Sequence, residues 1–198
     1  MEEECEVCRQ ERRSKALAAL GPDDLRFREE KFVRAIAIFS NNDIKYDMNK
    51  TRAALHAESN RLEVVYSVAQ DDPSAAAKRE CPTIAARKRE WLQRHDRECG
   101  DLYGMLQLTV RMPVAMTDHI DRSPDKLILR GRIGFVHSWV LDDGETSVVR
   151  DGVRILKKLP KVVFVKFPGA KWKLPSCGEA GVYPVVPKKA DWFLDAKR

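Results

Sequence analysis

Residues 112–140 read MPVAMTDHIDRSPDKLILRGRIGFVHSWV, and this stretch decides the fold. Its first part, residues 112–116, is a compact apolar run with a proline near its start, where a strand tolerates that residue. Residues 117–126 are polar and rich in turn-forming side chains. Residues 131–140 begin with glycine and are rich in β-branched and aromatic residues. The stretch therefore predicts a strand, a polar connection and a second strand.

The residues before this stretch have the pattern of an α/β unit. Residues 33–39 (VRAIAIF) form an apolar run suited to a buried strand, and the side chains that follow at once can cap a helix. Apolar residues then recur at helical spacing between positions 44 and 55. Residues 62–69 predict a second strand. A strand, a polar cap and a helix in this order are the repeating unit of a parallel α/β sheet.

After residue 131 the sequence pattern changes and predicts short strands separated by turns. Asp142, Asp143 and Gly144 form a hairpin-type turn signal between two of the apolar runs. Strands are predicted at 132–141, 146–149, 153–156, 161–167 and 182–186. Short, regularly spaced strands of this kind are typical of a small barrel or sheet.

Charge divides the chain into two unlike halves. The chain of 198 residues holds 36 Lys and Arg against 30 Asp and Glu, a net charge of +6. Residues 105–198 carry 17 of the basic residues and only 10 of the acidic ones. A basic half favours a polyanionic partner, because each neutralised phosphate releases counterions. Ordinary solvated lysines are the alternative interpretation.

Cysteine content and hydropathy bound the location of the chain. Five cysteines, an odd number, argue against a secreted disulfide framework. The first residues are acidic rather than basic and apolar, unlike a signal peptide, and no apolar stretch approaches the ~20 residues of a membrane span. We expect an intracellular protein with no membrane partner, with nucleus and cytoplasm unresolved.

The layout of residues 112–140 resembles a segment of the Pif (petite integration frequency) and RecD-like DNA helicases of superfamily 1. In that family an apolar "PV-M-L" strand precedes an Asn/Asp-rich stretch and a "G-x-x-G-x-V" strand. Here PVAM stands at 113–116 and GRIGFV at 131–136. The strand at 35–39, with Asn41, Asn42 and Asn49 after it, is similar to the start of the family's second RecA-like domain.

The resemblance implies an α/β fold, with a partial RecA-like parallel sheet layer and a small SH3-like β-barrel insert. It divides the chain into an N-terminal helical segment at 1–24, the RecA-like part at 25–118, the insert at 119–170 and a tail at 171–198 that returns to the α/β layer. It also implies a fragment of an ATP-dependent DNA helicase, a class that serves DNA repair, whose insert contacts single-stranded DNA.

The nucleotide-binding half of such a helicase has no counterpart in this sequence. No GxxxxGK[ST] phosphate loop is present, and no Asp-Glu pair ends an apolar strand to hold Mg²⁺. ATP and Mg²⁺ belong to the complete family protein, and we expect no cofactor in this chain. The missing first motor domain is therefore an expected partner, and the chain alone is not expected to hydrolyse ATP.

The candidate DNA contacts are basic residues beside aromatic ones, a combination that follows a backbone by charge and stacks on bases. One histidine, in the polar loop, joins them because the family's loop approaches DNA. The predicted nucleic-acid-binding residues are His119, Arg130, Arg132, Lys157, Lys158, Lys161, Lys171 and Trp172.

Each of these assignments has a structural alternative. Trp139 is expected in the core rather than at DNA, and for Trp172 packing and stacking are equally favoured. His137 alternates with Phe135 and Trp139 along the strand and is expected to pack with them. The rival function is a basic β-rich protein-interaction module without a nucleic-acid role.

No catalytic or metal site is predicted. Cys5 and Cys8 form a lone CxxC motif, and a zinc site would need two more ligands at suitable spacing. No nucleophile and base can be paired from the sequence, so an independent hydrolase has little support.

Overall fold

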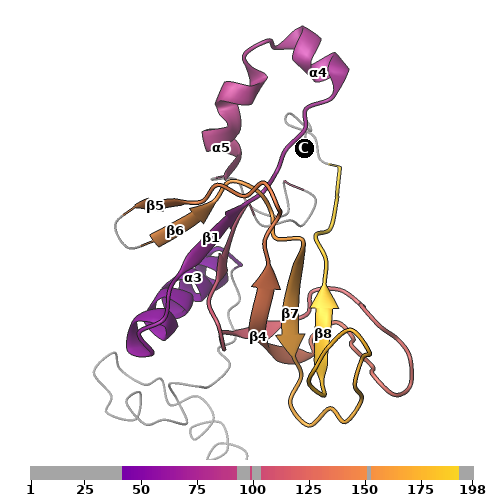
Figure 1. Ribbon diagram of the computed structural model, residues 1–198. Helices are drawn as coiled ribbons and strands as arrows, with labels where there is room; N and C mark the ends of the chain where they lie inside the picture. The colour runs from indigo at the N-terminus through magenta and orange to yellow at the C-terminus, as the bar shows by residue number, and fades with distance from the viewer. Residues whose placement is uncertain (1–41, 93–98, 100–103, 151–152, 192–198) are drawn as a thin grey trace, which may run out of the picture. The chain divides into compact units, whose positions relative to one another are not determined.

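The computed structural model describes residues 42–92, 99, 104–150 and 153–191, and these residues form a mixed α/β fold with two four-stranded sheets (Figure 1). The predicted N-terminal helical segment at 1–24, the predicted strand at 33–39 and the CxxC motif lie outside the described residues.

The helix predicted between positions 44 and 55 is confirmed as α3 (Asn42–Ser59). It ends in a Schellman motif, in which Arg61 has a left-handed φ of 53° and donates its N–H to the Glu58 carbonyl. The Leu62 N–H reaches back to Ala57 O at 2.9 Å. Ala57 is 1% exposed, so this face of the helix packs inward.

The first sheet has the strand order β2 (Met105–Leu108), β1 (Val65–Val68), β6 (Val153–Leu156) and β5 (Val148–Arg150). β1 pairs with β2 in antiparallel register and with β6 in parallel register, and β5 and β6 are antiparallel. A strand that lies almost ninety residues downstream therefore completes the sheet around β1.

The second sheet is antiparallel throughout, in the order β3 (Pro113–Ala115), β4 (Ile133–Val140), β7 (Val162–Lys166) and β8 (Val182–Val185). The strands predicted on either side of the polar connection are confirmed as β3 and β4. The predicted barrel is not found closed among the described strands, since the edge strands β3 and β8 each pair with one neighbour only.

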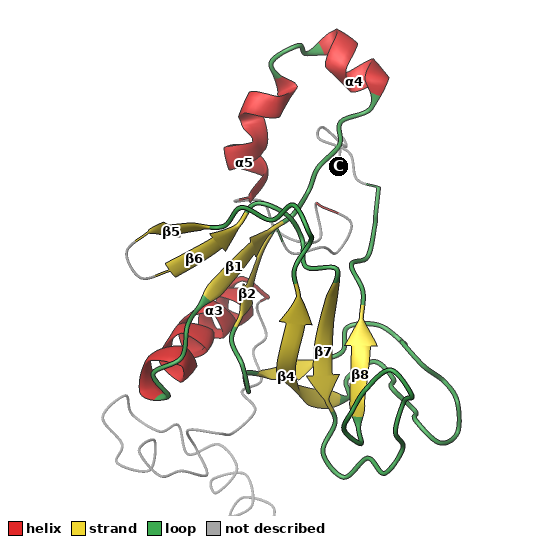
Figure 2. Cartoon of the chain, in the orientation of Figure 1, coloured by secondary structure: helices red, strands yellow, loops and turns green. Residues whose placement is uncertain are grey.

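The chain passes between the sheets more than once, because β5 and β6 belong to the first sheet while β4 and β7 belong to the second. The predicted division at residues 24, 118 and 170 stays a prediction. Two long loops, residues 116–132 and 167–181, lead into β4 and β8 (Figure 2).

A β-bulge in β4 reverses which side chains point inward. Val136 pairs with Val165 and Ser138 with Phe164, so His137 is the extra residue between them. Trp139 then faces inward and packs against the buried cluster of Val65, Leu108 and Leu156, as expected for a core residue.

The packing role predicted for His137 is wrong, because Gly134 and Val136 are the buried positions of this part of β4 and His137 lies on the exposed face with Phe135. Its side chain is 41% exposed, and its Nε2 lies 3.2 Å from a carboxylate oxygen of Glu179.

Residues 75–92 form three short helical pieces: α4 (Ala75–Glu80), a 3₁₀ turn (Ile84–Arg87) and α5 (Lys88–Leu92). Ser74 caps α4, since its hydroxyl accepts the Ala77 N–H at 3.1 Å. Within the described part of the chain, no helix has the length and apolar character needed to cross a membrane.

Candidate nucleic-acid interface

The predicted DNA contacts fall into two groups, one near each end of β4. Arg130 and Arg132 stand just before the strand, while Lys157, Lys158 and Lys161 lie beside the turn that follows it. An eight-residue strand spans about 25 Å, so the sequence pattern joined residues that the fold separates.

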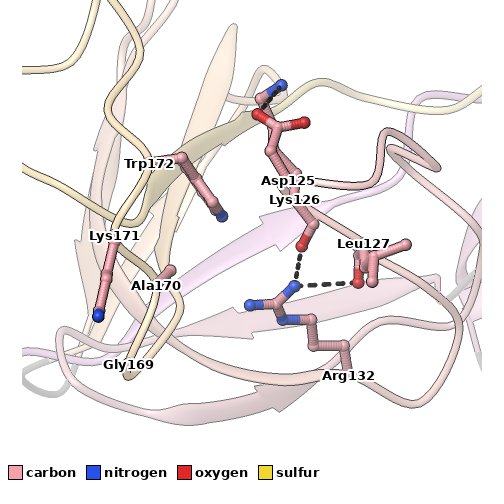
Figure 3. Close-up of a pocket in the computed structure, with 8 residues that line it drawn as sticks. All are labelled: Asp125, Lys126, Leu127, Arg132, Gly169, Ala170, Lys171 and Trp172. Carbon is pink, nitrogen blue, oxygen red and sulfur yellow. Dashed lines mark hydrogen bonds and ion pairs between the residues drawn. The ribbon is translucent and has the colours of Figure 1, made fainter.

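Three of the predicted residues, Arg132, Lys171 and Trp172, meet at a shallow pocket of about 590 Å³ between the two long loops (Figure 3). The turn at 125–127 forms one side, and the segment 169–172, which carries Lys171 and Trp172, forms the other. We call this feature the Trp172 pocket. Three predicted residues, separated by about forty positions in the sequence, thus line one depression.

Arg132 is engaged within the protein rather than free. Its Nη1 donates hydrogen bonds to the carbonyl oxygens of Lys126 and Leu127, the latter at 3.0 Å. Its guanidinium carbon lies 5.1 Å from the centroid of the Phe167 ring, within cation–π range. The side chain therefore holds the 125–127 turn against the sheet.

Trp172 both packs and lines the pocket. Its ring centroid lies 6.4 Å from that of Phe167 and 6.1 Å from that of Tyr183, the latter in a T-shaped arrangement. It belongs to the rim of the buried cluster of Ile128, Val165 and Phe167. Its Nε1 is buried and has no acceptor among the described residues, an arrangement that usually has a functional or hydration-related reason.

The remaining residues near this end differ in availability. Lys171 and the Arg130 side chain are exposed and make no ion pair with another described residue. His119 is exposed, and its Nδ1 accepts the Arg130 backbone N–H at 3.3 Å. His119 therefore shapes the loop from which Arg130 projects.

The second group is largely tied to the acidic turn after β4. Glu145 accepts the backbone N–H groups of Lys157 and Lys158 at 2.8 and 2.6 Å. The Lys158 ammonium lies 2.7 Å from Asp142, and Lys161 has a partner of its own in Asp143. Lys157 alone of these three lysines keeps a side chain without a partner among the described residues.

Sequence reasoning missed Leu127, which lies on the pocket's rim. It is 48% exposed and has a φ of 48°, a conformation that side-chain-bearing residues rarely adopt. An isolated leucine in a polar loop gives no pattern that separates an exposed position from a buried one. Phe167, which supports both Arg132 and Trp172, ends the predicted strand at 161–167, and its place beneath these two side chains depends on the fold.

Among the described residues, no group of three or more His, Cys, Asp or Glu side chains could hold a metal ion. The chain matches no protein-family model, no curated protein and no solved structure.

Five carboxylates on and around the second sheet have a lowered pKa, chiefly through hydrogen bonds from neighbouring lysines or Ser123. For Asp118 the first cause is the Lys188 ammonium, and for Glu179 it is the Lys166 ammonium. The five groups are Asp118, Asp121, Asp125, Asp142 and Glu179.

We expect these pairs to make the fold sensitive to acid. A carboxyl group with a pKa lower in the folded state stabilises the fold above its ordinary value, 3.8 for Asp118 and 4.5 for Glu179, and this contribution is lost as the pH falls below it. The melting temperature followed by circular dichroism should therefore drop below about pH 4.5. The double variant Lys166→Met/Lys188→Met should show a shallower drop, and equal slopes would contradict the assignment.

Proposed function

We propose that this chain is part of an ATP-dependent DNA helicase of the Pif and RecD-like kind and that it contacts single-stranded DNA. In this proposal residues 25–118 belong to the partial RecA-like layer and residues 119–170 to the SH3-like insert, with strands of both ranges pairing in each of the two sheets. The observation that carries the proposal is the meeting of Arg132, Lys171 and Trp172 at one pocket.

The available cations support a path for a nucleic-acid backbone. Arg130 and Lys171 flank the pocket end of β4, and Lys157 lies near the opposite end, all three exposed. These three side chains make no ion pair with a carboxylate of the described residues, so they can replace the counterions of phosphates. A single strand that follows β4 would meet an aromatic pocket and then Lys157.

The motor activity of the whole enzyme requires residues that this sequence lacks. Without a phosphate loop the chain has no backbone cradle for the β- and γ-phosphates of ATP. We therefore propose that it works only together with a first motor domain.

The direct test is fluorescence-anisotropy titration of a labelled oligo(dT) of about 16 nucleotides, the upper site size of single-strand-binding β-folds. The measurement is repeated at several salt concentrations with the variant Arg130→Gln/Lys157→Gln/Lys171→Gln. If these side chains contact phosphates, the slope of log K against log salt should become shallower by about 1 for each lost contact.

A matched control removes three charges elsewhere, in Lys50→Gln/Arg61→Gln/Arg79→Gln, whose side chains are also exposed. The control should keep the wild-type affinity and salt dependence. Absence of salt-sensitive binding in folded protein, or equal losses in both triple variants, would sink the DNA-contact proposal.

The outer face of the second sheet favours a second candidate function, protein binding. Ile133, Phe135 and Val140 are 44%, 38% and 45% exposed on β4, an unusual amount of apolar surface for one strand. A partner docked there would bind with little dependence on salt, which separates this function from DNA contact.

A further inference from the structure

We propose that the Trp172 pocket takes one unstacked nucleobase, and that Arg132 is a positioning residue that holds the pocket wall rather than a phosphate contact. The inference rests on the proposed function, since a base reaches the pocket only if a single strand binds here. It adds a ligand class, a nucleobase, and a role for Leu127.

The pocket lining includes an exposed leucine held in an unfavourable backbone conformation. Leu127 has a φ of 48° and keeps 48% of its side chain exposed, although a glycine or asparagine would occupy this position more easily. Strained residues of this kind persist only where the surroundings impose them, and they cluster at binding sites. The leucine side chain is therefore the feature that needs an explanation.

Arg132 imposes that conformation. Its Nη1 donates to the carbonyl oxygens of the two peptide groups that flank the Leu127 Cα, and its flat guanidinium rests over the Phe167 ring. Figure 3 shows the guanidinium directed at these two carbonyls beneath the pocket. A lysine could keep the charge, but it has no flat guanidinium to rest over the Phe167 ring while it donates to these carbonyls.

The chemistry of the pocket fits a base better than a phosphate. Leu127, Ala170 and the Trp172 ring supply its apolar lining. The Asp125 carboxylate is paired with the Lys126 ammonium at 3.2 Å, and Arg132 donates to two carbonyl oxygens, while Lys171 extends away from the indole (Figure 3). A flat ring can therefore lie against the apolar lining with its phosphate outside, within reach of Lys171.

The indole N–H adds a reason for a ligand with an acceptor. Trp172 Nε1 is buried without an acceptor among the described residues. In Figure 3 the nitrogen is on the side of the indole ring that points toward the 125–127 turn. An acceptor on the ligand, such as an exocyclic oxygen of thymine, would supply the missing hydrogen bond. Bases with exocyclic oxygens are therefore the expected occupants.

The test compares the full chain binding oligo(dT) with its binding of the same length of abasic strand, which keeps the phosphates and removes the bases. The wild-type protein should bind the abasic strand at least about tenfold more weakly. In Leu127→Asn the affinity for oligo(dT) should fall toward the abasic value. Its melting temperature should hold or rise, because asparagine accepts a positive φ.

Two further variants separate positioning from phosphate contact. Arg132→Lys should lose the preference for bases while its salt slope stays at the wild-type value. Lys171→Gln should weaken binding to both strands equally and lower the salt slope by about 1.

The outcomes divide cleanly. Salt-sensitive binding of both strands with equal affinity, unchanged by Leu127→Asn, would overturn the base pocket and leave the proposed function standing. Full retention of base preference in Arg132→Lys would overturn its positioning role. No binding of either strand by folded protein would overturn the pocket together with the proposed function.

Discussion

Replacing Phe167 with alanine should lower the free energy of unfolding by about 3–5 kcal/mol, the usual cost of truncating a fully buried phenylalanine. Phe167 is 0% exposed and forms one buried cluster with Ile128 and Val165. The same ring supports the Trp172 indole and lies beneath the Arg132 guanidinium. The substitution therefore removes the ring that contacts both Arg132 and Trp172, two of the residues that line the pocket.

Urea denaturation followed by circular dichroism measures this loss, with Phe164→Ala as the matched control. Phe164 lies on β7, three residues before Phe167, but it is only partly buried. Its truncation should therefore lower the free energy of unfolding by clearly less. Equal costs for the two substitutions would show that Phe167 is not the centre of the cluster.

Replacing Gly181 with alanine should cost about 2–4 kcal/mol, because two separate penalties add at this position. Gly181 has a φ of 73°, and an added Cβ would stand 2.8 Å from the Phe167 carbonyl oxygen and 3.0 Å from the Ala170 Cβ. Its N–H donates to Trp172 O at 2.8 Å, and its carbonyl accepts the Phe167 N–H at the same distance. A backbone shift here would therefore move the pocket loop.

Gly169→Ala separates the two penalties. Gly169 has nearly the same φ, 72°, but no atom lies within 4 Å of an added Cβ. It should cost only the conformational strain of about 1–2 kcal/mol. If thermal and urea denaturation give the same loss for both alanine variants, close packing around Gly181 is not the cause.

The individual strands could be predicted from local sequence, because each has its own apolar or alternating run and ends at a turn signal. This holds for β1, β4, β6 and β7, and for α3 with its helical spacing. Their pairing could not be predicted in the same way. The parallel pairing of β1 with β6 joins segments far apart in the sequence, and neither apolar run contains a signal that identifies its partner.

The direction of side chains along β4 shows where local pattern fails. Strict alternation places His137 with Phe135 and Trp139, but one extra residue in the bulge changes the inward set after Val136. A bulge depends on the register with β7, which is a tertiary property.

The candidate site divides along the same line. Residue type alone identified Arg132, Lys171 and Trp172 as suitable for nucleic acid, and their common pocket needed the fold. Residue type also grouped Lys158 and Lys161 with them, although both lie in ion pairs beside the turn after β4. Charge in a sequence does not reveal whether a carboxylate stands nearby to neutralise it.

Local sequence was enough to predict most strands, the helix α3 and the excess of positive charge in the second half, because hydrophobic periodicity, turn residues and charge act over a few positions. The packing of the chain sets which strands share a sheet, which cations have no carboxylate partner and how Arg132 holds the Leu127 turn. Those properties depend on contacts between loops some forty residues apart, which form only when the chain packs.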